Sequence, residues 1–404
     1  MDFSLSPEHL MVQKMVRDFA TKEVAHTIKE YDRKQEMNPA VLPRMAALGI
    51  MGICIPVKYG GQGFDYISLG LTCEELEAVD TSLRVVMSVH MGLNSMAVLQ
   101  WGTEEQKQRF LVPQAKGEQI AMFGLTEPGV GSDVANMVST ARKDGGDYLI
   151  NGEKMWISLA TKAHHILWFA KTNPNAPDPH EAITAFMIET DRPGVTCGDI
   201  HGKLGVRAGS TGWVNCKDVR VPAANRIGEE GEGFRIAMSC LDNGRLTVAA
   251  GAAGLIRASL DASVKYAKER KTFGREIGRH QLIQQKIAFM SQRYEIARLL
   301  YLRASWMKNQ GKRNTRETSL AKWYATDASF EAAHDAIQVH GAYGYSDEYD
   351  VERYLRNSRG AIIYEGTSEI HQLMQAGYAL GYRDDGALRC ELPAYDAKAW
   401  QEEK

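Results

Sequence analysis

The hydrophobic pattern of the chain changes twice along its length, and this limits the folds that it can adopt. Residues 6–120 follow a helical period and open on Ser6-Pro7-Glu8, the order of an N-cap followed by a first-turn proline. Residues 121–230 hold short apolar runs separated by Gly, Pro, Asn and Asp, which is typical of strands and turns. Helical periodicity returns from residue 231. The sequence therefore predicts helices, then strands, then helices.

Individual elements can be predicted within these regions. In the β region, Asn151-Gly152 separates the apolar runs YLI and KMWIS, and we predict a two-residue hairpin turn there because both positions tolerate positive φ. The final segment, CELPAYDAKAWQEEK, has the composition of an extended tail. Helices are expected over 234–268, 279–310 and 316–339, with a shorter one near 367–380.

The charge balance argues against functions that depend on a strong overall field. The 404 residues include 48 Lys and Arg against 50 Asp and Glu, a net charge of -2, so we expect neither nucleic acid nor a membrane as a partner. Six cysteines without metal-ligand spacing predict reduced thiols, no metal site and a cytoplasmic protein. The N-terminus lacks the pattern of a secretory leader, and no run of about 18 apolar residues occurs, so we expect no membrane span.

An arginine interrupts an apolar helical segment. Arg84 lies in AVDTSLRVVMSVH, residues 78–90, where a helix would normally bury an unbroken apolar face. A guanidinium keeps its charge inside a protein and needs an anionic partner there. Two kinds of partner remain open: the carboxylate of a ligand, or an ion pair within the helix with Asp80 or Glu77.

Two segments of the β region carry groups suited to a cofactor. In FGLTEPGVGSDV, glycines allow backbone N–H groups to approach an anion and hydroxyls can donate hydrogen bonds, although a plain surface turn explains the segment equally well. In KMWIS, Trp156 can stack on a flat ligand and Ser158 can reach a heteroatom, but core packing of Trp156 is the simpler alternative. A third segment, ERKTFGREIGRHQ, is by itself a solvated basic turn.

The fourth segment, AIIYEGTSEIHQ, places Glu365 between an apolar run and Gly366, with Thr367 or Ser368 able to cap a following helix. A carboxylate at the mouth of an apolar pocket has a raised pKa and can act as a general base. The alternative is a first-turn acid that is stabilised by the helix dipole.

Together, FGLTEPGVGSDV, KMWIS, ERKTFG and YEGTSEI resemble the acyl-CoA dehydrogenase family, and the resemblance extends over about residues 4–384. It implies an α+β fold with an N-terminal helical domain over 1–120 and a middle β-barrel domain over 121–230 that contacts flavin and substrate. A C-terminal four-helix bundle would follow over 231–385, with a tail over 386–404. It also implies one FAD per subunit and a homotetramer.

The resemblance also assigns individual residues. Glu365 matches the catalytic base, with Glu369, one helical turn on, as the next candidate. The substrate contacts it implies are Arg84, Ser132, Asp242, Arg245, Tyr364 and Gly366, of which Asp242 and Arg245 would hold the CoA moiety. The implied flavin contacts are Phe123, Leu125, Thr126, Ser132, Trp156, Ser158, Thr367 and Glu369. A neighbouring subunit would meet the adenine end of FAD through Arg270, Thr272, Phe273, Gln281, Gln338 and Gly341.

The family chemistry follows from these positions. The backbone N–H of Glu365 and a flavin hydroxyl would polarise the thioester carbonyl, Glu365 would remove the α proton, and the β hydride would pass to the flavin. The product is a 2-enoyl-CoA, and an electron-transferring flavoprotein is the usual acceptor. The alternatives are an acyl-CoA oxidase, which resembles longer chains, and a non-catalytic scaffold, against which the presence of Glu365 argues.

The segment around Arg84 most resembles the glutaryl-CoA and benzylsuccinyl-CoA dehydrogenase branch, the latter from aromatic compound degradation, in which an arginine holds the distal carboxylate. The expected substrate is a dicarboxylic acid mono-CoA ester, with room for a substituent at Gly92; a short, branched-chain or alicyclic acyl-CoA with a structural Arg84 is the alternative. Decarboxylating enzymes carry serine after this arginine. Val85 cannot donate a hydrogen bond, so we predict no decarboxylation.

Overall fold

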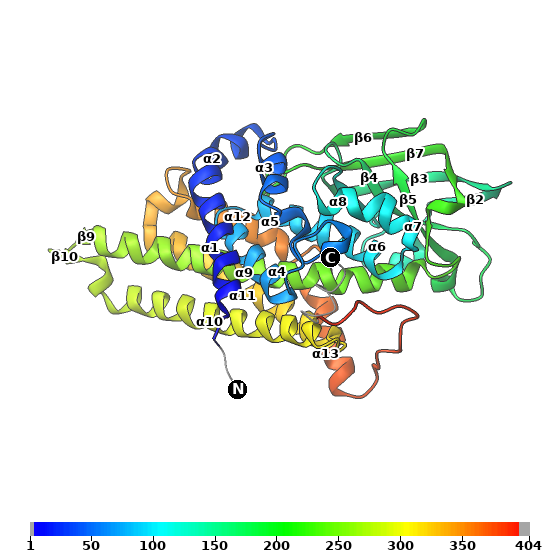
Figure 1. Ribbon diagram of the computed structural model, residues 1–404. Helices are drawn as coiled ribbons and strands as arrows, with labels where there is room; N and C mark the ends of the chain where they lie inside the picture. Colours follow the sequence, from blue (N-terminus) through cyan, green and yellow to red (C-terminus); the bar gives the residue numbers. More distant parts are fainter. Residues whose placement is uncertain (1–3, 396–404) are drawn as a thin grey trace.

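The computed structural model describes residues 4–395, and its first region is helical, as predicted (Figure 1). Ser6 caps the first helix through the backbone N–H of His9, with Pro7 in the first turn, so this predicted start is confirmed. The helices are α1 (Pro7–Asp18), η1 (Phe19–Val24), α2 (Ala25–Lys34), α3 (Val41–Ala47), η2 (Ile50–Gly52), η3 (Val57–Tyr59), α4 (Tyr66–Glu77), α5 (Thr81–Val86), η4 (Met87–Ser95), α6 (Met96–Trp101), α7 (Glu104–Gln106), η5 (Lys107–Leu111) and α8 (Val112–Ala115).

The middle region takes the form of one eight-stranded sheet (Figure 1, right). Its hydrogen-bonded order is β6-β7-β3-β2-β4-β5-β8, with β1 paired to β4. Over the described residues, the sheet of the expected β-barrel domain therefore does not close on itself, and β6 and β8 are its edge strands. The strands are β1 (Ala121–Gly124), β2 (Thr140–Asp144), β3 (Asp147–Ser158), β4 (His165–Lys171), β5 (Ile183–Glu189), β6 (Val195–Asp199), β7 (Thr211–Pro222) and β8 (Arg226–Ile227), with η6 (Val134–Asn136), η7 (Pro179–Ala182) and η8 (Ala223–Asn225) between them.

The predicted hairpin turn at Asn151-Gly152 is wrong. The turn between β2 and β3 lies at Gly145-Gly146, and Asn151-Gly152 lies inside β3, at a register shift against β7. Gly152 is needed there because a Cβ would lie 2.1 Å from Ser139 Oγ. Positive-φ residues suit a bulge as well as a turn, and the sequence signal alone does not separate the two.

The C-terminal region is helical and is organised around one long helix. The helix α9 has 37 residues and runs from beneath the sheet to the β9–β10 hairpin at the far left of Figure 1. The predicted helices are confirmed, but α12 and η10 were not foreseen. The elements are α9 (Gly233–Glu269), β9 (Lys271–Thr272), β10 (Arg275–Glu276), η9 (Ile277–Arg279), α10 (Gln281–Asn309), α11 (Thr315–His340), η10 (Gly341–Tyr345), α12 (Val351–Ala361) and α13 (Ser368–Ala379).

The described part of the tail, up to residue 395, packs against the body of the protein. Arg389 donates two hydrogen bonds to Glu232, at 2.8 and 2.7 Å, and Gln100 Nε2 donates to the carbonyl of Cys390 at 2.8 Å. The predicted tail residues 396–404 lie outside the described residues.

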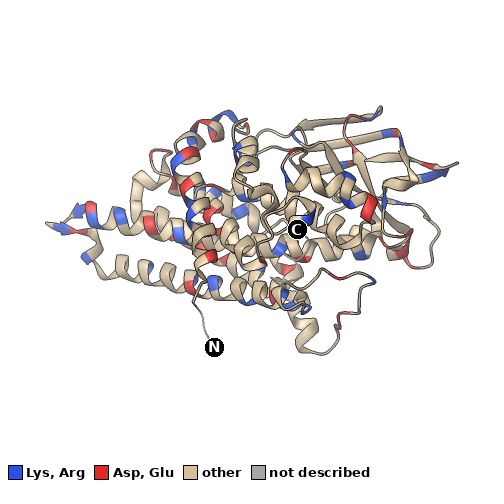
Figure 2. Cartoon of the chain, viewed as in Figure 1, with Lys and Arg blue, Asp and Glu red and all other residues tan. Residues whose placement is uncertain are grey.

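Three features bear on the predictions about membranes, nucleic acid and metal. By length and composition, the helical stretch Thr81–Trp101 could cross a membrane, but 94% of it is buried inside the structure, as is the core helix of a globular protein. Basic and acidic residues are interspersed along the helices and strands (Figure 2). Among residues 4–395, no group of three His, Cys, Asp or Glu side chains is placed to hold a metal ion.

Candidate active site

Glu365 lies in a turn of unusual backbone conformation between α12 and α13. Its φ is 55° and that of Gly366 is 97°, so two successive residues are left-handed. A non-glycine residue in this region costs of order 1–3 kcal/mol, and such residues cluster at functional sites. The hydroxyl of Thr367 caps α13 by accepting from the backbone N–H of Ile370 at 3.4 Å, which confirms one of the two predicted caps.

The carboxylate of Glu365 points into a confined space. Oε2 is buried and has no hydrogen-bond partner among the described residues. It faces Gly244 on α9, where a Cβ would lie 2.1 Å from Oε2. Burial raises the pKa of Glu365 to about 7, and the positive charges of Arg84, Arg245 and Lys322 oppose this rise. A carboxylate with this pKa is suited to general-base catalysis near neutral pH.

Two cations hold the backbone of this turn. Arg245 Nε on α9 donates to the carbonyl of Glu365 at 3.1 Å, and Lys322 Nζ on α11 donates to the carbonyl of Gly366 at 2.7 Å. Arg245 also pairs with Asp242 at 3.4 Å. The structure thus brings together Glu365, Gly366, Arg245 and Asp242, as the family resemblance implied, and adds Lys322, which the sequence reasoning missed.

Arg84 is fully buried and already has a partner inside the protein. Its Nε lies 2.5 Å from Glu77 Oε2, Nη1 donates to Ser88 Oγ at 2.9 Å, and Nη2 donates to the hydroxyl of Tyr364, the residue before Glu365. Glu77 is therefore the protein partner of Arg84, although it lies on α4 and not within the same helix. Burial raises the pKa of Glu77, and Arg84 opposes the rise.

The other proposed partner of Arg84 has a different role. Asp80 caps α5 through the backbone N–H of Ser82, at 2.9 Å, and pairs with Arg353 at 3.0 Å. The pair formed by Glu77 and Arg84 fits between the helices because position 251 on α9 is glycine: a Cβ there would lie 2.0 Å from Glu77 Oε2. The spacing of seven residues between an acid and an arginine was the only signal for this pair in the sequence.

The prediction of no decarboxylation assumed that, with valine at position 85, no hydroxyl lies beside Arg84, and the structure contradicts this assumption. Val85 is half-buried, but the hydroxyls of Ser88 and Tyr364 both contact the guanidinium. They were missed because neither is adjacent to Arg84 in sequence. Gly92 packs against α9: a Cβ there would be 3.5 Å from Gly244 Cα, an ordinary contact, and the predicted room for a substituent stays a prediction.

A second group of predicted residues surrounds the end of β1 and of β3. Trp156 lies at a register shift in β3, with φ 61°, and is 59% exposed. The alternative prediction, that Trp156 packs in the core, is therefore wrong. The backbone N–H of Met155 donates to the carbonyl of Thr126 at 2.9 Å, which places the two segments side by side. Phe123 and Leu125 are buried, Thr126 and Ser158 are half-buried, and Ser132 is exposed.

This group fits a flat, polar cofactor such as a flavin. It offers an exposed indole for stacking, nearby hydroxyls, and open space around Gly129 and Gly131, where a Cβ would meet nothing within 4 Å. A buried ion pair supports the loop: Lys154 Nζ lies 2.8 Å from Glu127, which also accepts from the backbone N–H of Ser139 at 3.0 Å. The sequence reasoning missed this pair.

The third predicted group lies at the opposite end of the molecule. Phe273 is 95% exposed at the β9–β10 hairpin, and Arg270 Cζ lies 5.9 Å from the ring centroid of Tyr343 in η10. Since α9 is about 55 Å long at 1.5 Å per residue, this end is remote from β3, the strand that carries Trp156 (Figure 1). Arg270, Phe273, Gln281, Gln338 and Gly341 are exposed, and Thr272 is half-buried.

Glu369 is a poor alternative base. It is exposed in the first turn of α13, and the Thr367 hydroxyl lowers the pKa of its carboxyl. A solvated carboxylate of low pKa takes up a proton only weakly.

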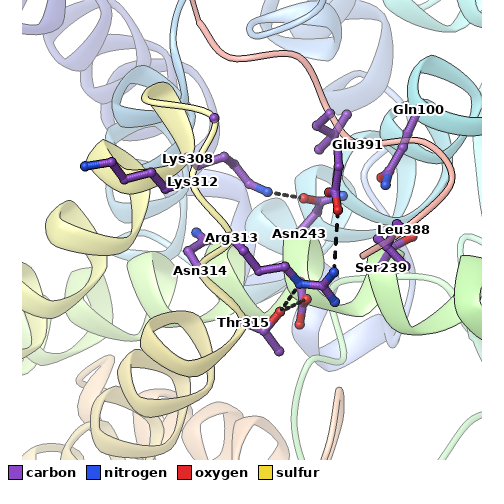
Figure 3. A pocket seen from close by; sticks show the side chains of 13 residues that line it. Gln100, Ser239, Asn243, Lys308, Lys312, Arg313, Asn314, Thr315, Leu388 and Glu391 are labelled. Carbon is purple, nitrogen blue, oxygen red and sulfur yellow. Dashed lines mark hydrogen bonds and ion pairs between the residues drawn. The ribbon is translucent and has the colours of Figure 1, made fainter. Parts of the chain in front are cut away.

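A cavity of about 170 Å³ opens beside Asp242 (Figure 3). Its lining combines cations with part of the tail: Lys308 Nζ donates to Asn243 Oδ1 at 2.6 Å, and Arg313 lies 3.5 Å from Glu391. Asn243 is 1% exposed, and its Nδ2 has no hydrogen-bond partner among the described residues. The cavity therefore offers positive charge and a free donor next to a residue predicted to hold CoA.

Comparisons with known proteins cover nearly the whole chain. Models of the acyl-CoA dehydrogenase N-terminal, middle and C-terminal domains match residues 6–118, 122–219 and 231–380. The chain is 42% identical to the probable acyl-CoA dehydrogenase YngJ of Bacillus subtilis, over 93% of this chain and 99% of that protein.

Two solved structures are similar to the same degree. The butyryl-CoA dehydrogenase from Megasphaera elsdenii superposes with a TM-score of 0.92 at 37% identity, over 94% of this chain and all of that one. A glutaryl-CoA dehydrogenase in complex with glutaryl-CoA superposes with a TM-score of 0.91, also at 37% identity, over 95% and 98%. The short-chain specific acyl-CoA dehydrogenase of Mus musculus is 39% identical over 93% of this chain and 91% of that protein. The comparisons therefore do not support the predicted glutaryl-CoA branch over the short-chain enzymes.

Proposed function

The chain belongs to the acyl-CoA dehydrogenase family of flavoprotein oxidoreductases, and we propose that it oxidises a short acyl-CoA thioester whose far end carries a carboxylate. The observation that carries this substrate class is the position of Arg84. Its guanidinium donates to the hydroxyl of Tyr364, the residue that precedes Glu365 in sequence, and its charge acts on the Glu365 carboxylate. A short chain can span the separation between these two side chains.

Glu365 acts as the base in this proposal. With its carboxylate unpartnered and its pKa near 7, it removes the α proton of the bound thioester. The backbone N–H groups of the left-handed turn face the thioester carbonyl and stabilise the charge that develops there. Thr126, Trp156 and Ser158 would hold FAD against the sheet, where it would supply the acceptor for a hydride from the β carbon.

The CoA moiety would lie along the start of α9. Asp242 and Arg245 project from successive turns of that helix. The cavity beside them is lined by Lys308, Lys312 and Arg313 as well as by the acids Asp242 and Glu391, and it would receive polar parts of the ligand. Ser132 would contribute a hydroxyl from the exposed loop after β1.

Arg84 can bind a carboxylate without losing its present partners. Three of its five N–H donors are used by Glu77, Ser88 and Tyr364, which leaves one donor on each terminal nitrogen. Paired N–H groups of this kind suit a carboxylate. Because three side chains fix Arg84, we propose that the bound carboxylate stays clamped and that the product keeps it.

A second candidate is an uncharged short acyl-CoA, and the ion pair with Glu77 favours it. An unpaired buried arginine would have rejected a plain acyl chain, but Glu77 already neutralises the charge of Arg84. The similarity to a butyryl-CoA dehydrogenase supports this alternative as well.

The test is to assay glutaryl-, benzylsuccinyl-, butyryl- and isovaleryl-CoA side by side. We expect higher kcat/KM for the two charged esters. The double variant Glu77→Gln/Arg84→Met removes both charges without leaving one unpaired, and it should lower kcat/KM for the charged esters about 10- to 100-fold, the worth of a charge-assisted hydrogen bond. The matched control is Asp80→Asn/Arg353→Met, a second buried pair, which should not change the preference.

Preference of the wild-type protein for butyryl- or isovaleryl-CoA would refute the carboxylate proposal and leave the dehydrogenase in place. Turnover of an ester labelled in its distal carboxyl group addresses decarboxylation: labelled CO2 in stoichiometric amount would show that the carboxylate is lost.

We also propose a homotetramer and an electron-transferring flavoprotein as the electron acceptor. The helix α10 exposes Leu282, Phe289 and Ile296 at intervals of seven residues, an apolar stripe suited to a second copy of the chain. The two ends of the flavin site lie at opposite ends of one chain, so a neighbouring subunit would complete it. Light scattering tests the assembly, and slow flavin reoxidation in air tests the acceptor.

The cytoplasmic location and the absence of a nucleic-acid partner stay predictions.

A further inference from the structure

Lys322 is a buried lysine without a carboxylate partner. It is 0% exposed on α11, and within the described part of the chain it forms no ion pair. Its Nζ instead donates to the carbonyl of Gly366 at 2.7 Å. A buried ammonium group with no acid in contact destabilises the fold. Its presence at this position therefore implies a use for its charge or for its hydrogen bond.

Each of the two carbonyls of the strained turn accepts a hydrogen bond from a cationic side chain. Lys322 holds that of Gly366, and Arg245 holds that of Glu365 at 3.1 Å. These bonds come from two different helices, α11 and α9, and together they fix the left-handed conformation that directs the Glu365 carboxylate toward Gly244.

Three cations lower the pKa of Glu365, and two of them have an acid bonded to them. Arg84 on α5 pairs with Glu77, and Arg245 on α9 pairs with Asp242. His371 on α13 is neutral near pH 7, because burial lowers its pKa to about 3.

The remaining acid, Asp327 on α11, is engaged elsewhere. It accepts hydrogen bonds from Ser368 Oγ at 2.7 Å and Trp323 Nε1 at 2.9 Å. Lys322 is thus the cation whose field on Glu365 no bonded acid cancels among the described residues.

We propose that Lys322 is a positioning residue for the base: its ammonium group pins the Gly366 carbonyl and its positive charge keeps the Glu365 carboxylate ionised. The proposal rests on the role of Glu365 given above. The pKa values support this proposal. Burial lowers the pKa of Lys322 to about 7, and the charge of Glu365 opposes that fall. The charge of Lys322 in turn lowers the pKa of Glu365. The charged form of each group therefore favours the charged form of the other.

The test compares Lys322→Gln, which can still donate to the Gly366 carbonyl but has no charge, with Lys322→Arg, which keeps the charge. The measurement is anaerobic flavin bleaching by substrate from pH 5.5 to pH 9 in holoenzyme. We expect Lys322→Gln to move the apparent pKa of bleaching upward by about one unit, with a near wild-type rate at high pH. Lys322→Arg should keep the wild-type profile. Lys322→Met, which loses bond and charge, should show the same shift and a lower maximal rate.

Ser329→Ala is the matched control, because Ser329 is also buried on α11 and donates only to the Thr326 carbonyl of its own helix. It should leave the profile unchanged. An unshifted profile in Lys322→Gln, or an equal loss of rate at every pH, would overturn the proposal, and Lys322→Gln decides the matter even if Lys322→Met does not fold. Failure of the base assignment is separately visible, because Glu365→Gln would then bleach at the wild-type rate.

Discussion

Gly244→Ala should displace the carboxylate of Glu365, the proposed base. A Cβ at this position would lie 2.1 Å from Glu365 Oε2, 2.8 Å from its Cδ and 2.8 Å from Leu93 Cδ2. Since an ordinary contact is at least about 3.4 Å, the carboxylate must move by about 1 Å or more. A misplacement of about 1 Å can cost about 10²-fold in rate, so we expect flavin bleaching to slow about 100-fold.

The assay separates misplacement from unfolding. Anaerobic stopped-flow bleaching gives the rate, FAD content gives the integrity of the flavin site, and titration with an enoyl-CoA product gives ligand affinity. Gly146→Ala is the matched control, because a Cβ there would meet nothing within 4 Å. Bleaching of Gly244→Ala within threefold of wild type, with FAD bound, would refute the reasoning and show that the carboxylate need not occupy its present position.

Other predictions follow from single contacts. Glu365→Gln should still bind substrate but lose bleaching by more than the ~10²–10⁴ of general-base assistance, and wild-type bleaching should rise with pH through about 7. Because the pKa of Glu365 is raised from 4.5 to about 7 by folding, stability falls as pH rises between these values; Glu365→Gln should have the higher Tm at pH 8, and the difference should shrink toward pH 5. Gly251→Ala, whose Cβ would meet Glu77 Oε2 at 2.0 Å, should destabilise the fold by about 1–3 kcal/mol in urea unfolding, unlike Gly146→Ala. Trp156→Ala should purify with less FAD but an unchanged helical circular dichroism spectrum, because its side chain is exposed.

The sequence by itself determined the order of the elements and several of their ends. Helical and strand periodicities are local properties, and so are caps: Ser6 and Thr367 each accept from a backbone N–H three residues along the chain. The family motifs likewise identified Glu365, Trp156 and the residues around them. Local signals failed where one pattern fits two structures, as at Asn151-Gly152, which forms a bulge inside β3 and not a turn.

Only the tertiary structure decided what surrounds those residues. Arg84 meets the Tyr364 hydroxyl across 280 positions of sequence, and Lys322 meets the Gly366 carbonyl across 44. Such contacts depend on how closely helices approach, and here glycines at positions 244 and 251 of α9 set that approach. The pKa of Glu365 depends in turn on burial and on charges brought from α5, α9 and α11. Periodicity predicts which face of a helix is buried, but the partner that it meets there is fixed by packing across the whole chain.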